Sequence, residues 1–410
     1  MKKFFALLLS LAMVLALVAC GQKDPTPDTP DTPDDPQTKV EYKVAMITDY
    51  GDITDQSFNQ TTYEACKAFA EDNSIEFSYF KPAGDNTADR VAMIEKAVDE
   101  GFNVIVMPGY AFGGAIVEAA PEFPDVKFIA LDVAASDLLE TAVAKAGEAY
   151  DYTPENWDLN KYVDMSNVYC AVYQEELCGY MAGYAAVKLG YKNLGFLGGM
   201  SVPAVVRYGY GFVQGVDAAA ADLGLTDVKL NYIYGGQFFG DADITAVMDT
   251  WYQGGTEVVF ACGGGIYTSA VDAAKKVGAK VIGVDVDQAG VIANYAGVDG
   301  MTVTSAMKGL YPATYDTLTD VIVNGNWEKY VGKIETLGLV SGTDPEANYV
   351  QIPMGDGTQW SDSFTQDDYK AMVKDMFDGK ITVSNNISSD VSAADFATVI
   401  TVDDQGAIKG

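Results

Sequence analysis

From residue 43 onward, short runs of β-branched and aromatic residues alternate with longer segments whose apolar residues recur at helical spacing. This alternation is typical of βαβ units with parallel strands buried on both faces. A first series predicts strands over 44–47, 77–80, 104–107 and 127–131, and helices over 57–72, 87–100 and 113–120. A second series predicts strands over 168–172, 193–197, 230–234, 258–261 and 280–284, and helices over 175–189, 203–223, 241–253 and 267–277. The pattern therefore predicts an α/β protein with two doubly wound parallel sheets, one after the other.

Two regions depart from this alternation of strands and helices. Residues 137–166 have no clear period and predict a surface insertion near a crossing between the lobes. The later chain offers only the segments 301–306, 309–324, 334–337, 367–377 and 381–383, which most simply complete the lobes by crossing back between them. We therefore expect lobe 1 to comprise residues 40–166 and about 303–330, lobe 2 to comprise 167–302 and about 331–410, and crossover strands to form a hinge.

The N-terminus is typical of a secretory signal. Lys2 and Lys3 precede an apolar run, Phe4–Ala19, that is too short to cross a hydrocarbon core of about 30 Å. Residues 17–20, Leu-Val-Ala-Cys, resemble the bacterial lipobox, which implies removal of residues 1–19 and lipidation of Cys20. An ordinary signal with a chance cysteine is the alternative. Residues 20–39 are rich in Pro, Asp and Thr and predict a disordered tether.

Charge and composition exclude several function classes. A net charge of −32 argues against nucleic acid and anionic lipid surfaces as partners. The absence of histidine removes Ser-His and Cys-His nucleophile pairs and the commonest zinc ligand, and we expect neither a metal nor a cofactor. The remaining cysteines lack CxxC spacing and are predicted to be small buried hydrophobes, although an exported chain could pair two of them. They are Cys66, Cys170, Cys178 and Cys262.

Candidate binding residues lie in loops that follow predicted strands, where open α/β sheets bind their ligands. Residues 48–59 form an acidic loop in which Asp55 or Ser57 can cap the following helix, while Phe58 could lie flat against a planar ligand. Asp132 directly follows a buried strand, where it could bind a ligand or only begin a turn.

Three more such loops lie in the second half. Residues 234–241 place Phe238 and Phe239 between glycines, and residues 261–265 contain three successive glycines around Gly264 that let backbone N–H groups approach a ligand. The strand 280–284 is followed by Asp285 and Asp287, which fit Ca²⁺ poorly but suit the hydroxyls of a diol.

Several motifs resemble the basic membrane protein family of ABC-transporter lipoproteins, the PnrA-like nucleoside receptors. They are Asp-Gln-Ser-Phe-Asn at 55–59, Gly-Phe-Leu-Gly-Gly-Met at 195–200 with Pro203 and Gly211-Phe212, Gly-Val-Asp-Val-Asp-Gln at 283–288, and Thr-Ser-Ala-Met-Lys at 304–308. These motifs follow the family order across residues 43–385. Tyr63 is a departure, because the family usually has Trp there.

The resemblance implies a type I periplasmic-binding-protein fold that clamps a nucleoside between its lobes. The base would stack between Phe58 and Phe238, with Phe239 and Tyr208 as alternatives to the second ring. Asp132 would accept hydrogen bonds from the base, Asp285 would hold the ribose and Lys308 would close the site. Further ligand-side positions are Asp49, Ser57, Asn59 and Gly264.

We therefore predict a monomeric, lipid-anchored solute-binding protein of an ABC importer on the extracytoplasmic face of the cell membrane. It would close on a nucleoside, with purine ribosides favoured, and deliver it to a membrane permease. A receptor for a sugar or other polar solute, and a ligand sensor for a membrane signalling protein, are alternatives. An exported nucleoside hydrolase would have to rely on Asp285 and Asp287.

Overall fold

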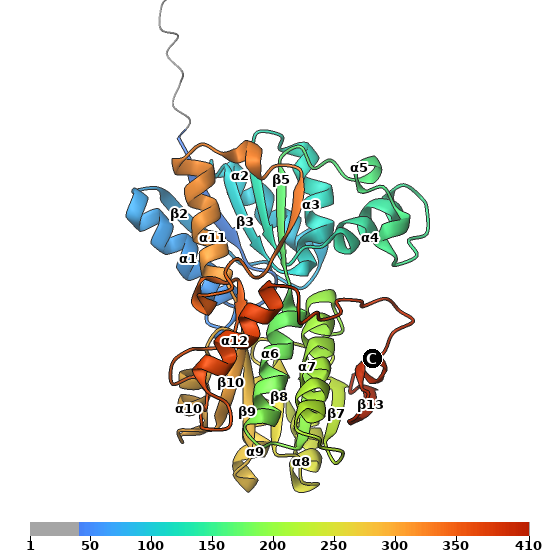
Figure 1. The fold of residues 1–410 in the computed structure, drawn as a ribbon. Coiled ribbons are helices and arrows are strands. Elements are labelled where there is room, and N and C mark those ends of the chain that lie inside the picture. Colours follow the sequence, from blue (N-terminus) through green and yellow to red (C-terminus); the bar gives the residue numbers. More distant parts are fainter. Residues whose placement is uncertain (1–40, 410) are drawn as a thin grey trace, which may run out of the picture. The chain divides into compact units, whose positions relative to one another are not determined.

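A computed structural model describes residues 41–409, and the residues from Tyr42 onward form one compact unit. The predicted signal, Cys20 and most of the tether lie outside the described residues. The unit contains two sheets (Figure 1). The first has the order β11-β5-β4-β3-β1-β2 and is parallel throughout. Its strands are β1 (Lys43–Ile47), β2 (Glu76–Phe80), β3 (Val104–Pro108), β4 (Lys127–Leu131), β5 (Val168–Tyr173) and β11 (Lys333–Leu337).

The second sheet has the order β12-β10-β9-β8-β6-β7-β13, in which only β12 runs antiparallel to its neighbour. Its strands are β6 (Asn193–Gly198), β7 (Lys229–Tyr234), β8 (Val258–Cys262), β9 (Lys280–Asp285), β10 (Thr302–Lys308), β12 (Val350–Gln351) and β13 (Thr401–Ala407). The central strands β6, β8 and β9 are almost wholly buried, as their continuous apolar runs predict.

Helices cover both faces of the first sheet because both faces carry apolar side chains. The helices α2 (Thr87–Asp99), α3 (Gly113–Ala119) and α4 (Ala135–Lys145) contribute to one core cluster. On the other face, α1 (Phe58–Asn73) packs beside α11 (Leu310–Leu318), although the two lie far apart in sequence (Figure 1). A short helix, α5 (Leu159–Tyr162), follows α4.

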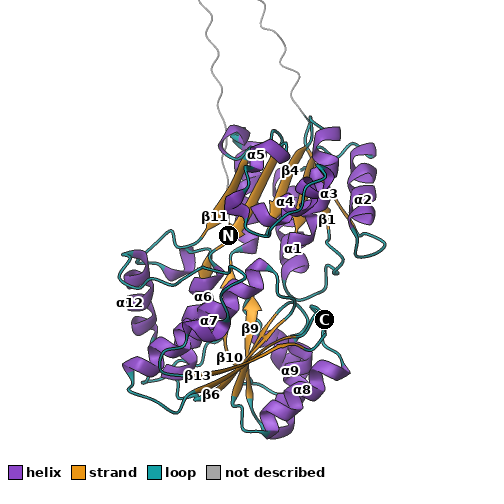
Figure 2. Cartoon of the chain, turned by 90° about the vertical axis from the view of Figure 1, so that its right-hand side faces the viewer, coloured by secondary structure: helices purple, strands orange, loops and turns teal. Residues whose placement is uncertain are grey.

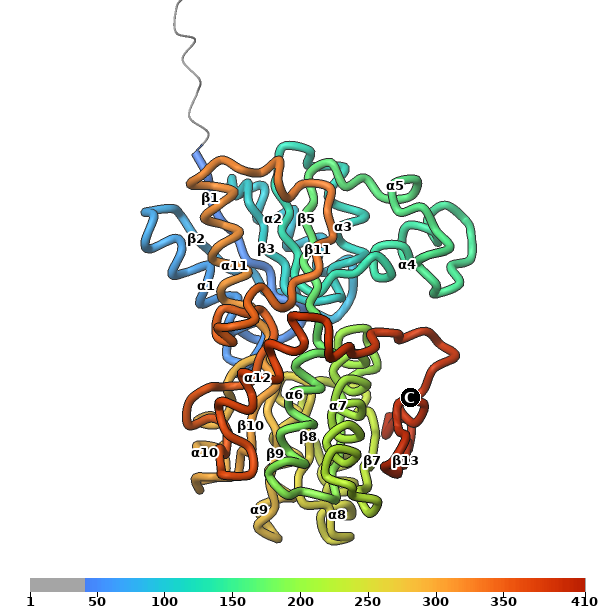
Figure 3. Tube along the Cα trace, in the orientation of Figure 1, coloured from blue at the N-terminus to red at the C-terminus, as the bar shows by residue number. Residues whose placement is uncertain are grey.

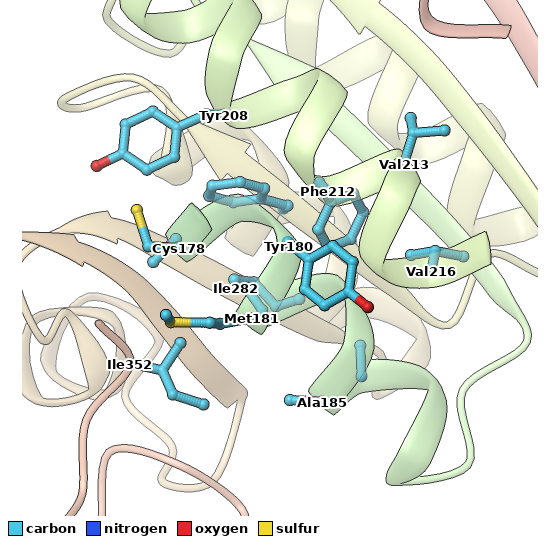
Figure 4. Packing of buried hydrophobic residues seen from close by; sticks show 14 of the residues in the cluster. Cys178, Tyr180, Met181, Ala185, Tyr208, Phe212, Val213, Val216, Ile282 and Ile352 are labelled. Atoms are coloured by element: carbon cyan, nitrogen blue, oxygen red, sulfur yellow. The ribbon is translucent and has the colours of Figure 1, made fainter. Parts of the chain in front are cut away.

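The second sheet is sandwiched in the same way (Figure 2). One face packs against α6 (Glu175–Lys188), α7 (Pro203–Asp222) and α12 (Gln366–Phe377), and the other against α8 (Ala242–Gln253), α9 (Tyr267–Val277) and α10 (Ala289–Ala296). The helices α6 and α7 approach closely, since a Cβ at Gly179 or Gly211 would collide with the backbone of the facing helix. Side chains of both helices, including Met181 and Phe212, enter one core cluster (Figure 4).

The chain passes between the sheets at three points, from β5 to α6, from β10 to α11 and from β11 to β12 (Figure 3). Segments from distant parts of the sequence therefore complete each sheet, as the sequence predicted. Three strands lie in the other lobe from the one predicted: β5 and β11 were assigned to lobe 2 but belong to the first sheet, and β10 was assigned to lobe 1 but belongs to the second. A buried apolar run has the same pattern in either sheet, so its periodicity cannot identify its neighbour.

Other differences follow from weak sequence signals. The predicted insertion begins with a true helix, α4, whose Leu138, Leu139, Ala142 and Val143 are buried. The sequence missed α10, β12 and β13, and residues 381–383 form no strand. The cysteines of the described chain are buried, as predicted, and each is free, so no two of them are paired. Among residues 41–409, no helix is long and apolar enough to cross a membrane.

Candidate functional site

A cavity of 410 Å³ lies where the carboxyl ends of strands from both sheets meet. It is lined by residues that follow β1, β3 and β4 in the first sheet and β8 in the second, and by the last residues of β9 and β10. This is the position at which open α/β sheets bind ligands. Of the predicted site residues, all but Ser57 line it: Asp49, Phe58, Asn59, Asp132, Phe238, Gly264, Asp285 and Lys308.

Phe58 is held by a local network at the start of α1. Asp55 caps the helix: its Oδ1 accepts from the backbone N–H groups of Ser57 (3.0 Å) and Gln60 (3.1 Å), and its Oδ2 from that of Asn59 (2.9 Å). Ser57 makes no side-chain cap; its buried hydroxyl instead donates to Asp285 Oδ2 at 2.6 Å, which joins the first sheet's α1 to the end of β9. Of the two candidate caps, Asp55 is therefore the one that caps α1. Ser57 is not part of the cavity lining.

Asp49 shapes the same loop from its other end. Its Oδ1 accepts hydrogen bonds from the backbone N–H groups of Tyr50 (2.6 Å) and Gly51 (2.7 Å) and from Asn59 Nδ2 (3.1 Å). Burial raises the pKa of Asp49, and these hydrogen bonds only partly offset that rise. Asn59 Oδ1 is buried with no partner among the described residues, so an acceptor remains for a ligand donor or water.

Lys308 stands at the centre of a buried charge cluster. Its ammonium forms an ion pair with Asp132 and lies 3.5 Å from Glu175 Oε1 and 3.7 Å from Asp285 Oδ1. It also lies 4.8 Å from the centre of the Phe58 ring. Burial alone lowers the pKa of Lys308, but the three carboxylates outweigh it and hold the pKa above its ordinary value. Lys308 is therefore charged, and the cavity wall still carries an excess of acidic groups.

Both carboxylates at the strand ends have unusual backbone conformations. Asp132, just after β4, has φ of 59°, and Asp285, at the end of β9, has φ of 65°. Left-handed conformations of non-glycine residues cluster at functional sites, where the surrounding structure holds them. Asp132 Oδ1 is buried without a hydrogen-bond partner among the described residues, and burial raises the pKa of this carboxyl. Asp285 also faces Tyr208, whose hydroxyl lies 3.4 Å from Oδ1.

Phe238 lines the cavity from the loop after β7, which we call the Phe238 loop (residues 235–241). Its ring lies against Gly199 and Gly263, where any Cβ would collide with it. Its carbonyl accepts from the N–H of Gly265 at 2.9 Å, which ties the loop to the triple glycine. Phe239, one of the alternatives to the second ring, is 56% exposed, whereas Tyr208, the other, is 1% exposed. Phe58 and Phe238 thus reach one cavity from elements of different sheets.

Other residues of the cavity and its surroundings were not predicted from the sequence. Tyr110 lines the cavity after β3, with its ring 6.4 Å from that of Phe238 and its hydroxyl 3.5 Å from Met200 Sδ. Its position after a buried strand was a usable signal. Glu175 forms an ion pair with Arg207, whose Nε lies 2.6 Å from Glu175 Oε2. Glu175 gave no such signal, because an acidic residue in the first turn of a helix ordinarily stabilises the helix through its dipole.

Two positions noted in the sequence lie away from the cavity lining. Tyr63 packs against the rings of Phe77 and Tyr79. Asp287 accepts from the N–H of Ala289 at 3.1 Å and does not join Asp285. Within the described part of the chain, no group of three or more acidic or cysteine side chains could hold a metal ion.

Comparison with known proteins identifies the family. The model of the Bmp family, described as "ABC transporter substrate-binding protein PnrA-like", matches residues 42–343. The "ABC transporter nucleoside-binding protein BmpA" of Lactococcus lactis subsp. cremoris is 25% identical over 92% of this chain and 96% of its own. An "uncharacterized lipoprotein" of Pyrococcus abyssi is 25% identical over 74% of this chain and 69% of its own.

Solved structures agree on the fold. An ABC transporter solute-binding protein from Aeropyrum pernix K1 has a TM-score of 0.63 at 19% identity, over 85% of this chain and 95% of that one. The fold is the type I fold of periplasmic solute-binding proteins. The role implies a small-molecule ligand and a permease partner. The chain therefore belongs to the PnrA-like Bmp family of ABC transporter substrate-binding proteins, and it is a solute-binding protein rather than an enzyme.

Proposed function

We propose that the cavity binds a nucleoside, with purine ribosides favoured, and that the lobes close around it for delivery to the permease. The observation that carries this proposal is the placement of Phe58 and Phe238, from different sheets, on one cavity that also contains Asp285. Stacking on an aromatic ring contributes about 1–3 kcal/mol per base and accepts any base. The relative named for nucleoside binding supports the same ligand class.

Selectivity in this proposal comes from the polar groups. Asp132 Oδ1 and Asn59 Oδ1 are buried acceptors without partners among the described residues, which suits a base that offers N–H donors. Asp285 suits the vicinal hydroxyls of ribose and would be poorly satisfied by a 2′-deoxy sugar. Nucleotides are disfavoured because Lys308 already faces Asp132, Glu175 and Asp285, which would repel a phosphate.

The anchor and the location belong to the same proposal. We infer that Cys20, which lies outside the described residues, carries lipid and holds a monomeric receptor at the extracytoplasmic face of the membrane. The support is the lipobox-like sequence at 17–20 and the lipoprotein names of relatives. Mass spectrometry of the mature N-terminus tests this: we expect acylated Cys20, and an unmodified cysteine would contradict it.

Calorimetric titration of the full chain in detergent tests the ligand. Inosine and guanosine should bind, hypoxanthine should bind more weakly, and inosine monophosphate and ribose should bind least. Arabinose and glucose test the alternative of a sugar receptor, and their binding without nucleoside binding would replace our proposal. Chromatography of the same mixtures should show no free base, whereas its release would indicate hydrolysis.

A further inference from the structure

The C-terminal segment contacts the Phe238 loop directly. After β13, the N–H of Ile408 donates to the Tyr234 carbonyl at 2.8 Å, and Ile408 packs against the core cluster of α8 and α9. The backbone of Lys409 lies against Gly236, whose φ of +81° and lack of Cβ leave room for it. The residues after 343 lie beyond the part matched by the family model, so this contact comes from outside the matched region.

Lys409 connects the two ends of the Phe238 loop. Its ammonium forms an ion pair with Asp241 and lies 3.2 Å from Gln237 Oε1. The Gln237 amide nitrogen in turn donates to Asp241 Oδ2 at 3.0 Å and to the Phe239 carbonyl at 2.9 Å. Gln237 and Asp241 lie on either side of Phe238 along the chain, and Lys409 binds both of them.

The segment that carries Lys409 is itself firmly attached. Strand β13 pairs with β7 from Thr401 to Ala407. Just before it, the buried Asp217 of α7 accepts from the backbone N–H groups of Thr398 (2.8 Å) and Val399 (2.8 Å) and from the Thr398 hydroxyl (2.6 Å). Lys409 thus extends from a fixed strand, and its ion pair can restrain the loop.

We propose that Lys409 is a positioning residue for ligand binding, which holds the Phe238 loop so that its ring forms one wall of the cavity. This inference rests on the proposed function for the identity of the ligand. It assigns a role in the binding site to the segment that follows β13. Because the ion pair is partly exposed, with side-chain exposures of 34% for Lys409 and 26% for Asp241, the effect should be modest.

The test compares Lys409→Met, Lys409→Arg and wild type as full chains. With inosine as probe, calorimetry should show Kd raised about twofold to fivefold in Lys409→Met and largely restored in Lys409→Arg, as expected for a partly exposed ion pair. Hydrogen exchange should become faster in residues 235–241 of Lys409→Met and stay unchanged in β6 and β8. Lys380→Met, which removes an exposed lysine paired with Asp375, is the matched control and should change neither measurement.

The outcomes separate this inference from the proposed function. If the wild type does not bind inosine, the nucleoside proposal fails, and the exchange rates of residues 235–241 alone decide the positioning role. If the wild type binds and Lys409→Met matches it in Kd, the positioning role is wrong, whether or not exchange changes. A uniform rise in exchange across the second sheet would also overturn it, because that indicates general destabilisation.

Discussion

The two loops that bring aromatic rings to the cavity are held in different ways. The loop before Phe58 is organised by its own near neighbours, Asp49 and Asp55, within eleven positions of chain. The Phe238 loop depends on Gly199, Gly263 and Lys409, which lie far away in sequence. The wall that carries Phe58 is therefore organised mainly by local hydrogen bonds, with the Ser57–Asp285 bond as a link to the second sheet. The wall that carries Phe238 depends more on tertiary contacts.

This difference explains which parts of the site the sequence could predict. Asp55 and Phe58 stand in a recognisable helix start. Capping chemistry offered Asp55 and Ser57 as caps, and the structure shows that Asp55 is the cap, while the position of Phe58 after a strand predicted its place on the cavity. The support of Phe238 required knowledge of β13, whose Thr401–Ala407 segment has only a weak strand pattern and was missed. Its exposed, polar residues carry no period-2 signal.

The fold shows the same limit. Strands such as β8 and β9 were predicted because buried parallel strands form continuous apolar runs. The sheet to which β5, β10 and β11 belong was not predictable from those runs, because strand pairing is a long-range property. Glu175 was missed for a related reason: only the packing of α6 against Lys308 shows that it faces the site rather than solvent.

The largest expected effect comes from removing either ring. Phe58→Ala and Phe238→Ala should each raise the Kd for inosine by roughly 5- to 150-fold, corresponding to the loss of ~1–3 kcal/mol of stacking. Calorimetry measures both. Phe239→Ala removes the neighbouring ring, which also lines the cavity but is 56% exposed, and it should cost less. A normal affinity in either of the first two variants would mean that the ring concerned does not touch the base.

A smaller effect should follow from removing the carboxylate assigned to ribose. Asp285→Ala should weaken inosine binding about tenfold and hypoxanthine binding hardly at all, which corresponds to the lower end of the ~1.5–3 kcal/mol that a hydrogen bond to a charged group contributes. Competition binding with both ligands gives the ratio. Asp287→Ala, which alters a carboxylate outside the cavity lining, should leave both affinities unchanged. Equal losses for inosine and hypoxanthine in Asp285→Ala would refute the ribose assignment.

Asp241 caps α8 as Asp55 caps α1, because its Oδ1 accepts from the N–H of Ile244 at 2.9 Å. The two caps allow a direct comparison of stability. Asp55→Ala should lower the free energy of unfolding by about 1–2 kcal/mol and Asp241→Ala by about 0.5–1 kcal/mol, because Asp55 satisfies more donors at a more buried site. Urea unfolding measures both values. Asp367→Ala, in the first turn of α12 but not its cap, is the control. A larger loss of unfolding free energy for Asp241→Ala than for Asp55→Ala would contradict the expectation that Asp55 is the more stabilising cap.

The smallest expected effect is a difference in pKa between Asp55 and Asp241. Burial raises the pKa of Asp55, whereas hydrogen bonds from Ile244 N–H and Lys409 lower the pKa of Asp241. The pKa of Asp55 is therefore higher in the folded than in the unfolded state. As the pH rises from the unfolded-state pKa through the folded-state pKa, ionisation of Asp55 progressively lowers the free energy of unfolding. The contribution of Asp241 is present above its unfolded pKa and is lost as the pH falls through its folded pKa.

Carboxyl carbon NMR shifts report these two titrations. On acidification from pH 7, Asp55 should protonate first and Asp241 last. The reverse order would show that the carboxyl of Asp55 is more open to water than its burial in the structure indicates.

A crystal structure of the protein grown with inosine would show directly whether the base lies between the two rings. We predict that the base lies between the rings of Phe58 and Phe238, with the ribose hydroxyls within hydrogen-bonding distance of Asp285. Inosine bound elsewhere, or in the cavity with its base in contact with neither ring, would contradict the account.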